Sequence, residues 1–253
     1  MKNYYLLYLL TFLNFFFHPL QSQEFIAVLI GDTLDDSIGN SVQLDLKRME
    51  KKVDALAKKL EITLKKTIIK DDAFQSDTLI EILSKVEVNE DDLVFIYYSG
   101  HGYRSDSTET PWPNIALKNE WRGISHHALT EVFLNKKPFF LLSIADACNN
   151  VIPDEWAPIL LKTKALSSTK HEKENLKKLF LNQSLFIMAS GSSPTYFSYC
   201  NDYVGGFFSS TLLKNIDLAL SSNQEPDWYL ILAKTKAELE DMQKPQYEII
   251  PLN

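Results

Sequence analysis

Runs of consecutive apolar residues alternate along this chain with segments whose apolar residues recur at helical spacing. The first run, EFIAVLIG at 24–31, is almost wholly apolar and ends at a glycine, which is typical of a strand buried on both faces. The segment 41–60 then repeats its apolar residues as an amphipathic helix does. Further strands are expected at 62–70, 92–100, 137–148 and 184–190, and further helices at 76–86, 124–134, 205–216 and 227–242. This alternation predicts an α/β fold, a three-layer α/β/α sandwich with a mostly parallel sheet.

The composition is that of a globular protein with one sizeable core. Of the 253 residues, 45% are hydrophobic and 23% are charged, so the chain is neither disordered nor fibrous. We find no internal repeats and no long linker. We therefore expect a single domain over residues 23–253.

The first 22 residues have the pattern of a secretory signal peptide. Lys2 precedes an apolar stretch over 4–17, and Pro19 and the small residue Ser22 follow it. The apolar stretch is shorter than the roughly 20 residues that a membrane span needs. We expect a secreted or periplasmic protein without membrane contact after cleavage, with an uncleaved membrane anchor as the alternative.

The charge balance disfavours nucleic acid as a partner. Loss of residues 1–22 removes one positive charge, which leaves 25 of the 26 lysines and arginines against 33 acidic residues, a net charge of −8 instead of −7. Such a chain repels phosphate backbones, and no basic patch with interleaved aromatic residues is present.

Unusual residues follow two of the expected strands. Ser-Gly-His-Gly at 99–102 follows the third strand, and Ala-Asp-Ala-Cys-Asn-Asn at 145–150 follows the fourth. Chemistry in parallel sheets collects beyond the carboxyl ends of the strands, and adjacent strands lie about 5 Å apart. If these two strands are neighbours, His101 and Cys148 meet at one edge, and the glycines that flank His101 let its loop turn sharply.

This pair of residues suits nucleophilic catalysis. A cysteine is only slightly ionised near neutral pH, and an adjacent imidazole can take its proton. After the sulfur attacks a carbonyl group, the resulting oxyanion needs N–H donors, which the backbone of Gly102 and of Cys148 can supply. His101 would act first as general base and then as general acid.

At these residues the chain resembles the caspase-like cysteine peptidases, including the metacaspase and paracaspase branches. Those proteins carry an apolar strand ending in Ser-Gly-His-Gly and, roughly 50 residues later, a strand ending in an acid or glutamine, a small residue and the nucleophile. Here the interval is 47 residues, and the second motif is Asp-Ala-Cys at 146–148. FIAVLIGD, SVQLDLKRM, LFIMASGSSPTYFS and GGFFSSTLL are similar to further family segments, so the resemblance covers about residues 24–220.

The resemblance implies a cysteine endopeptidase that acts on protein or peptide substrates without a metal or cofactor. In the metacaspase and paracaspase branches, acids that match Asp146 and Asp45 line the S1 pocket and pair a basic P1 side chain, which implies cleavage after Arg or Lys. Asn149-Asn150-Val151 replaces the usual His-Ser-Gly, and 104–113 is short of calcium-binding acids. Calcium dependence and oligomeric state are left open.

Each candidate also has a simpler interpretation. Cys148 could be an ordinary buried cysteine, Asp146 a turn residue and Asp45 an exposed acid. A caspase-like domain without activity, used as a binding module, is therefore the alternative function. The adjacent His126 and His127 point about 100° apart on a helix, so we expect surface residues and not a metal site.

Two further expectations concern Cys200 and a lysine-rich segment. Two cysteines are too few for a disulfide framework, and we expect the Cα atoms of Cys200 and Cys148 to lie more than about 7 Å apart. Residues 162–170 precede an expected helix at 171–180. Exposed polar segments are readily cut, so we expect self-cleavage after Lys164 or Lys170.

Overall fold

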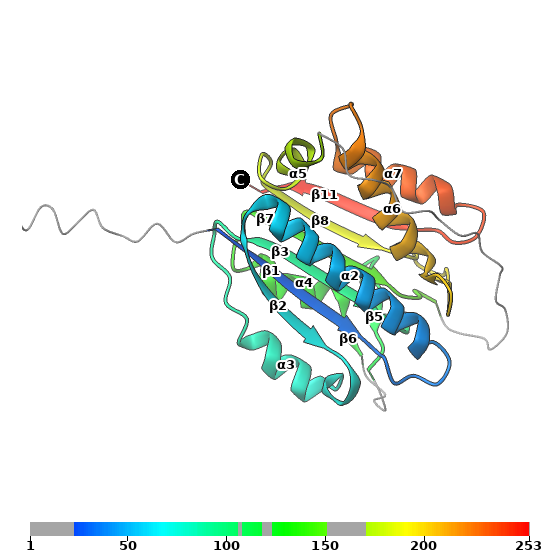
Figure 1. The fold of residues 1–253 in the computed structure, drawn as a ribbon. Coiled ribbons are helices and arrows are strands. Elements are labelled where there is room, and N and C mark those ends of the chain that lie inside the picture. Colours follow the sequence, from blue (N-terminus) through cyan, green and yellow to red (C-terminus); the bar gives the residue numbers. More distant parts are fainter. Residues whose placement is uncertain (1–22, 106–107, 118–122, 151–170, 253) are drawn as a thin grey trace, which may run out of the picture.

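The computed structural model describes residues 23–105, 108–117, 123–150 and 171–252. Its centre is a six-stranded sheet in the order β11-β8-β7-β3-β1-β2 (Figure 1). The strands are β1 (Glu24–Gly31), β2 (Thr63–Ile69), β3 (Leu93–Ser99), β7 (Phe140–Asp146), β8 (Leu185–Ser190) and β11 (Gln246–Pro251). Neighbouring strands are parallel except for β11, which is antiparallel to β8.

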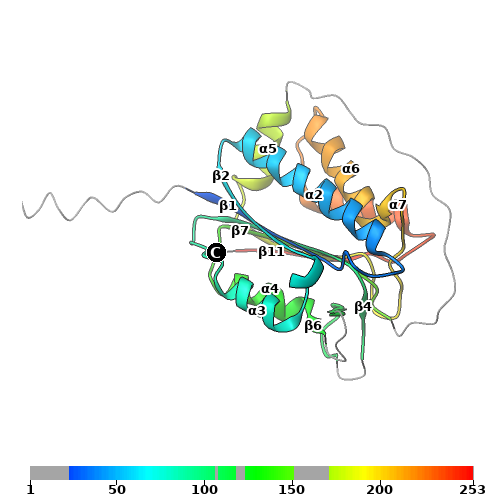
Figure 2. The ribbon, with the colours of Figure 1, turned by 60° about the horizontal axis from the view of Figure 1, so that its bottom comes forward.

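Helices cover both faces of this sheet, which confirms the predicted three-layer sandwich. In Figure 2, α2, α5, α6 and α7 lie on one side of the sheet, and α3 and α4 lie on the other. Their bounds are α2 (Gly39–Leu60), α3 (Ser76–Ser84), α4 (His126–Leu134), α5 (Glu172–Phe180), α6 (Phe207–Ser221) and α7 (Trp228–Leu239). Every residue of β3, β7 and β8 is buried, which explains why these strands read as unbroken apolar runs.

Each helical layer packs on its own hydrophobic core. Alternate residues of a strand point to opposite faces, so Leu29 and Tyr97 belong to the core under α2 and α6. Ile30 and Tyr98, one residue further along their strands, belong to the core under α3 and α4. The two cores pack against opposite faces of the central strands and so fix where the carboxyl ends of these strands lie.

Short strands and a single helical turn extend the loops between the main elements. β4 (Gly102–Tyr103), β5 (Asn114–Ile115) and β6 (Ile124–Ser125) form a small antiparallel sheet directly after β3. β9 (Cys200–Asn201) and β10 (Gly205–Gly206) form a hairpin before α6. A 3-10 turn, η1 (Asp71–Ala73), follows β2. The small sheet and the hairpin extend the carboxyl ends of β3 and β8.

The expectation that both adjacent histidines lie at the surface is wrong for His126. Its side chain is fully buried, and its Nε2 atom lies 2.9 Å from Ser143 Oγ, while its ring packs edge-on against Trp112. The first turn of α4 lies against β7, which places His126 inward and leaves the side chain of His127 partly exposed.

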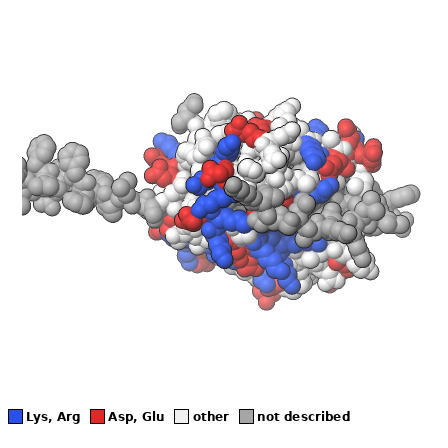
Figure 3. Space-filling model, turned by 45° about the horizontal axis from the view of Figure 1, so that its top comes forward, with Lys and Arg blue, Asp and Glu red and all other residues white. Residues whose placement is uncertain are grey.

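Charged side chains of both signs share the outer surface of α2 and α5. Figure 3 shows lysines and arginines next to acidic residues on this face. Lys59 pairs with Glu172, and Lys173 pairs with Glu61 at 2.6 Å. Such exposed pairs contribute little individually, so the attachment of α5 comes mainly from its buried apolar residues.

Several sequence-based expectations fall outside the described residues. The segment 1–22, expected to be a signal peptide, is among them, as are Lys164 and Lys170. The expected helix at 171–180 is confirmed as α5.

None of the described helices is both long enough and apolar enough to cross a membrane.

Candidate active site

The strand that precedes His101 and the strand that precedes Cys148 are neighbours, which is the condition under which the two residues were expected to meet. β3 and β7 pair in parallel, with Ser99 opposite Asp146. The Gly100 N–H donates to the Asp146 carbonyl oxygen at 3.3 Å, so the two loops leave the sheet together. A Cβ atom on Gly102 would lie 2.3 Å from the Cys148 carbonyl oxygen, which shows that the two backbones touch. Only glycine permits this approach, because a neighbouring backbone cannot move aside cheaply.

The ring of His101 contacts the loop between β1 and α2. Its Nε2 atom lies 3.3 Å from Asp35 Oδ2 and 3.3 Å from Ser37 Oγ. The Tyr98 hydroxyl donates to the His101 carbonyl oxygen at 2.7 Å and anchors the backbone of the loop. Asp35 is not among the site residues predicted from the sequence. Its position shortly after a strand whose end lies beside that of β3 was the available signal.

The thiol of Cys148 lies against the loop that follows β8. Its Sγ atom is 3.4 Å from both the carbonyl oxygen and the amide nitrogen of Ser198. Burial raises the pKa of the Cys148 thiol, and the Asp146 charge raises it further, while the Ser198 amide acts in the opposite direction. The resting thiol is therefore protonated at neutral pH, and it needs a base before it can attack.

No hydrogen bond joins the His101 ring to the Cys148 thiol within the part of the chain that the structure describes. In structures without substrate, catalytic hydrogen bonds are often long and tighten only when substrate binds. The chain thus brings the two loops into contact without a preformed pair between the reactive groups.

Two buried carboxylates lie beside this edge of the sheet. Asp45 is 2% exposed and accepts hydrogen bonds from the Ser99 hydroxyl at 2.9 Å and the Gly206 amide at 2.8 Å. Asp146 is 6% exposed and accepts hydrogen bonds from the Ser198 hydroxyl at 2.6 Å and the Ser209 amide at 2.8 Å. Asp45 is therefore not an exposed acid. Asp146 does more than cap a turn, since its carboxylate links two separate elements.

The hairpin formed by β9 and β10 holds the two carboxylates together. A Cβ atom on Gly206 would lie 2.1 Å from Asp146 Oδ2 and 3.0 Å from Asp45 Oδ2. Gly205 has φ of 72°, and a Cβ atom there would lie 2.0 Å from Asp45 Oδ1. The consecutive glycines therefore let the backbone approach both acids more closely than any side chain would allow.

The environment of these acids favours their neutral forms. Burial raises the pKa of Asp45, and the nearby Asp146 raises it further, against the hydrogen bonds from Gly206 and Ser99. Burial likewise raises the pKa of Asp146, against the hydrogen bonds from Ser198 and Ser209. Neither acid forms an ion pair with a lysine or arginine among the described residues.

Asn149, which directly follows Cys148, is hydrogen-bonded to two other loops, the one between β4 and β5 and the one after β8. It is fully buried, and its side-chain amide donates to the Pro111 carbonyl oxygen at 2.8 Å. The backbone N–H of Asn149 donates to the Tyr196 carbonyl oxygen at 3.0 Å. The Arg104 guanidinium donates to the side-chain oxygen of Asn149 at 3.4 Å. This structural role of Asn149 could not be predicted from the sequence motif.

Cys200 is a free thiol, as is Cys148. It faces Gly206 across the β9–β10 hairpin, close to the acid pair. Burial raises the pKa of Cys200 to about 11, so its thiol is protonated at neutral pH. The separation of its Cα atom from that of Cys148 stays a prediction.

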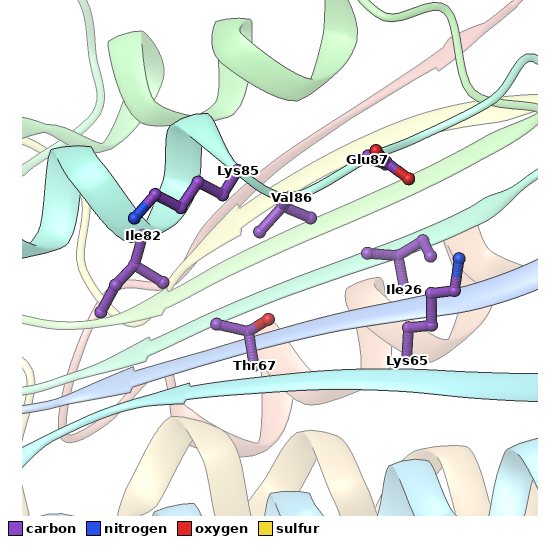
Figure 4. Close-up of a pocket in the computed structure, with 7 residues that line it drawn as sticks. All are labelled: Ile26, Lys65, Thr67, Ile82, Lys85, Val86 and Glu87. Atoms are coloured by element: carbon purple, nitrogen blue, oxygen red, sulfur yellow. The ribbon is translucent and has the colours of Figure 1, made fainter.

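A separate hollow of about 330 Å³ lies between the end of α3 and the sheet, away from the strand ends (Figure 4). It is lined by Ile26, Lys65, Thr67, Ile82, Lys85, Val86 and Glu87. Because neither His101, Cys148 nor either buried acid lines it, this hollow is separate from the candidate active site. In the described ranges, no group of three His, Cys, Asp or Glu side chains is placed to hold a metal ion.

A three-layer α/β sandwich with a histidine loop and a cysteine loop in contact at neighbouring strand ends defines a class of caspase-like proteins. The chain belongs to the caspase domain family, whose sequence model matches residues 25–252. A search of curated proteins found no match.

Solved structures agree with the assigned fold. Caspase-1 from Spodoptera frugiperda matches with a TM-score of 0.54 at 14% identity, over 91% of this chain and 87% of its own. A protein from Geobacter sulfurreducens matches with a TM-score of 0.52 at 14% identity, over 89% of this chain and 93% of its own. At this identity the likeness concerns the fold alone. The family match confirms the resemblance inferred from the sequence motifs.

Proposed function

We propose that this chain is a cysteine endopeptidase that uses His101 and Cys148 and cleaves after lysine or arginine. Membership in a family of cysteine peptidases supports the general activity. The observation that carries the finer proposal is the pair of buried acids, Asp45 and Asp146, which lies beside Cys148 with no lysine or arginine ion-paired to it among the described residues.

The proposed reaction begins with transfer of the Cys148 thiol proton to His101. The sulfur then bonds to the carbonyl carbon of the substrate, and the Gly102 and Cys148 amides stabilise the oxyanion. The C–N bond breaks as His101 returns the proton to the leaving amine, which leaves a thioester on Cys148. Water, deprotonated by His101, hydrolyses the thioester and restores the thiol. The raised pKa of Cys148 makes the proton transfer to His101 a required step.

The preference for a basic P1 residue follows from the cost of burying charge. An ionised carboxylate out of water carries a penalty of several kcal/mol unless a cation compensates it. In the free protein, the acid pair limits this cost by taking up protons, as its raised pKa values show. Arg48 of α2 already acts on Asp45, and a lysine or arginine side chain of the substrate would bring a second positive charge to the acid pair. An aspartate at P1 would instead be repelled.

Peptide hydrolysis by matched variants tests this proposal. We expect turnover of peptides with P1 Arg or Lys, and none with P1 Asp. Cys148→Ala and His101→Ala should each abolish turnover, and the double variant should be no worse than either one, because the two residues act as a unit. Cys200→Ala is the control for loss of the other thiol. Wild-type turnover by Cys148→Ala would contradict the proposal.

The alternative is a caspase-like domain that binds peptides without cleaving them. The absence of a hydrogen bond between the His101 ring and the Cys148 thiol, in the part of the chain described, is the observation in its favour. A wild-type chain that binds basic peptides tightly but releases no product would establish this alternative.

We further propose that the chain is exported by cleavage after residue 22 and cuts itself after Lys164 or Lys170. The support is the sequence pattern of 1–22 and the opposite charges of these lysines and of the buried acids Asp45 and Asp146 when ionised. The N-terminal sequences of the exported chain and of chain incubated after purification test both steps. An uncut wild-type chain that hydrolyses basic peptides would show that activity does not need self-cleavage.

A further inference from the structure

The carboxylate of Asp35 divides its contacts between its two oxygen atoms. Oδ1 accepts hydrogen bonds from the Ser37 amide at 2.8 Å, the Ser37 hydroxyl at 2.6 Å and the Ile38 amide at 2.9 Å. Oδ2 instead faces His101 Nε2 at 3.3 Å. One oxygen atom therefore holds the loop before α2, and the other is available to the histidine ring.

The main sheet determines that these residues meet. β1 and β3 are neighbours with Gly31 opposite Ser99, and the Asp32 amide donates to the Ser99 carbonyl oxygen at 3.4 Å. The loop that carries Asp35 and the loop that carries His101 thus leave adjacent strand ends. The side chains of Asp35 and His101 are 23% and 34% exposed, so the contact is partly shielded from water.

Asp35 is ionised at neutral pH. Burial alone would raise its pKa, but the hydrogen bonds from Ser37 and Ile38, aided by the nearby His101, lower it below the ordinary value. The ring therefore faces a negatively charged acceptor.

We propose that Asp35 is a positioning residue that accepts the Nε2–H of His101 and thereby fixes the orientation and tautomer of the ring. A neutral imidazole that donates from Nε2 keeps its lone pair on Nδ1, which is then the atom that takes the thiol proton. Asp35 also stabilises the imidazolium that forms in that step. This inference rests on the proposed function, because Asp35 acts only through His101.

Asp35→Asn separates the two roles of this carboxylate. Asparagine keeps an oxygen atom for the hydrogen bonds from Ser37 and Ile38, but it presents an amide group that cannot accept from Nε2–H. We expect kcat for a basic peptide to fall about 10- to 100-fold with KM nearly unchanged, in the range that orienting partners contribute. Asp36→Asn is the matched control, since it removes the same charge from the exposed neighbouring residue and should leave kcat unchanged.

A second measurement follows Cys148 without substrate. The rate at which iodoacetamide alkylates Cys148, measured by mass spectrometry of its peptide, should fall in Asp35→Asn. In a His101→Ala background, the same substitution should have no further effect on alkylation, because the ring through which Asp35 acts is gone.

The outcomes separate this inference from the proposed function. If Asp35→Asn keeps wild-type kcat and alkylation while Asp35→Ala loses both, Asp35 serves only the loop and the inference is overturned. An effect of Asp35→Asn that persists undiminished without His101 would also overturn it. If the wild-type chain hydrolyses no peptide, the proposed function fails, and the alkylation rates still show whether Asp35 acts through His101.

Discussion

At the scale of single residues, the site is defined by acidic side chains that are held away from water. Asp45 and Asp146 keep their places through hydrogen bonds from serine hydroxyls and backbone amides, and the glycines of β10 allow the close approach. Hydrogen bonds to a carboxylate favour its charged form, but burial outweighs them in both cases. The pair therefore changes its charge with pH in a range where most carboxylates are already ionised.

This raised pKa predicts a pH dependence that differs between substrates. As pH rises through the range in which the acid pair loses its protons, the pair becomes more negative, and under the proposed function it should attract a basic P1 residue more strongly. We expect kcat/KM for a P1 Arg peptide to rise more steeply with pH than kcat/KM for a P1 Ala peptide. The neutral peptide is the internal control for the titration of the catalytic groups.

Asp146→Asn tests whether the acid pair causes this difference. The variant should lose more activity toward P1 Arg than toward P1 Ala, and the two pH profiles should become more alike. Parallel pH profiles for both peptides in the wild-type chain would show that the acids do not contact P1.

At the scale of elements, the order of the strands determines which residues meet. Alternation of apolar strands with amphipathic helices was enough to predict the mostly parallel sheet, but it left the neighbouring positions of β3 and β7 as a condition, which the structure meets. Residues on loops were harder to place. Asp35 and Asn149 reach the site through turns whose paths depend on contacts with distant segments, and no local periodicity records such contacts.

The junction of α4 and β7 contains a buried ionisable residue that sequence reasoning placed at the surface. Burial lowers the pKa of His126 to about 3. The spacing of α4 was the available signal, because His126 lies on the same helical face as Leu129 and Phe133, which are also buried. Its partner, Ser143, lies on a strand that forms the opposite side of the contact.

His126 makes stability fall as the pH is lowered. Between the ordinary histidine pKa of 6.5 and the folded value of about 3, the unfolded chain binds a proton at this residue that the folded chain excludes. The contribution of His126 to the free energy of unfolding should therefore be complete above pH 6.5. It should fall by up to about 1.4 kcal/mol per pH unit below that value.

Urea unfolding between pH 4 and pH 7.5 measures this effect. His126→Gln should flatten the loss of stability on acidification, although its stability at pH 7.5 will be lower because Gln fills the space less well. His127→Gln, which changes the partly exposed neighbour, should keep the wild-type pH slope. The raised pKa values of the acid pair act in the opposite sense, so the difference between variant and wild type is the informative quantity. Equal slopes in all three chains would contradict the burial of His126.

At the scale of the whole molecule, the fold presents three neighbouring strand ends at one edge. β1 leads to Asp35, β3 leads to His101, and β7 ends at Asp146 two residues before Cys148. The family and the fold could be inferred from sequence because several motifs occur in the family's order, and the family match confirms that inference. The functional roles of these residues stay predictions, because they depend on how the site responds to a substrate.

Covalent labelling of the active site is the most direct test of the central claim. A peptidyl acyloxymethyl ketone with P1 Lys would be incubated with the wild-type chain, with Cys148→Ala and with Cys200→Ala, and the adduct would be located by mass spectrometry. We predict one adduct on Cys148 in the wild-type chain and in Cys200→Ala, and none in Cys148→Ala. An adduct on Cys200, or no adduct on a chain that remains folded, would contradict the assignment of Cys148 as the nucleophile.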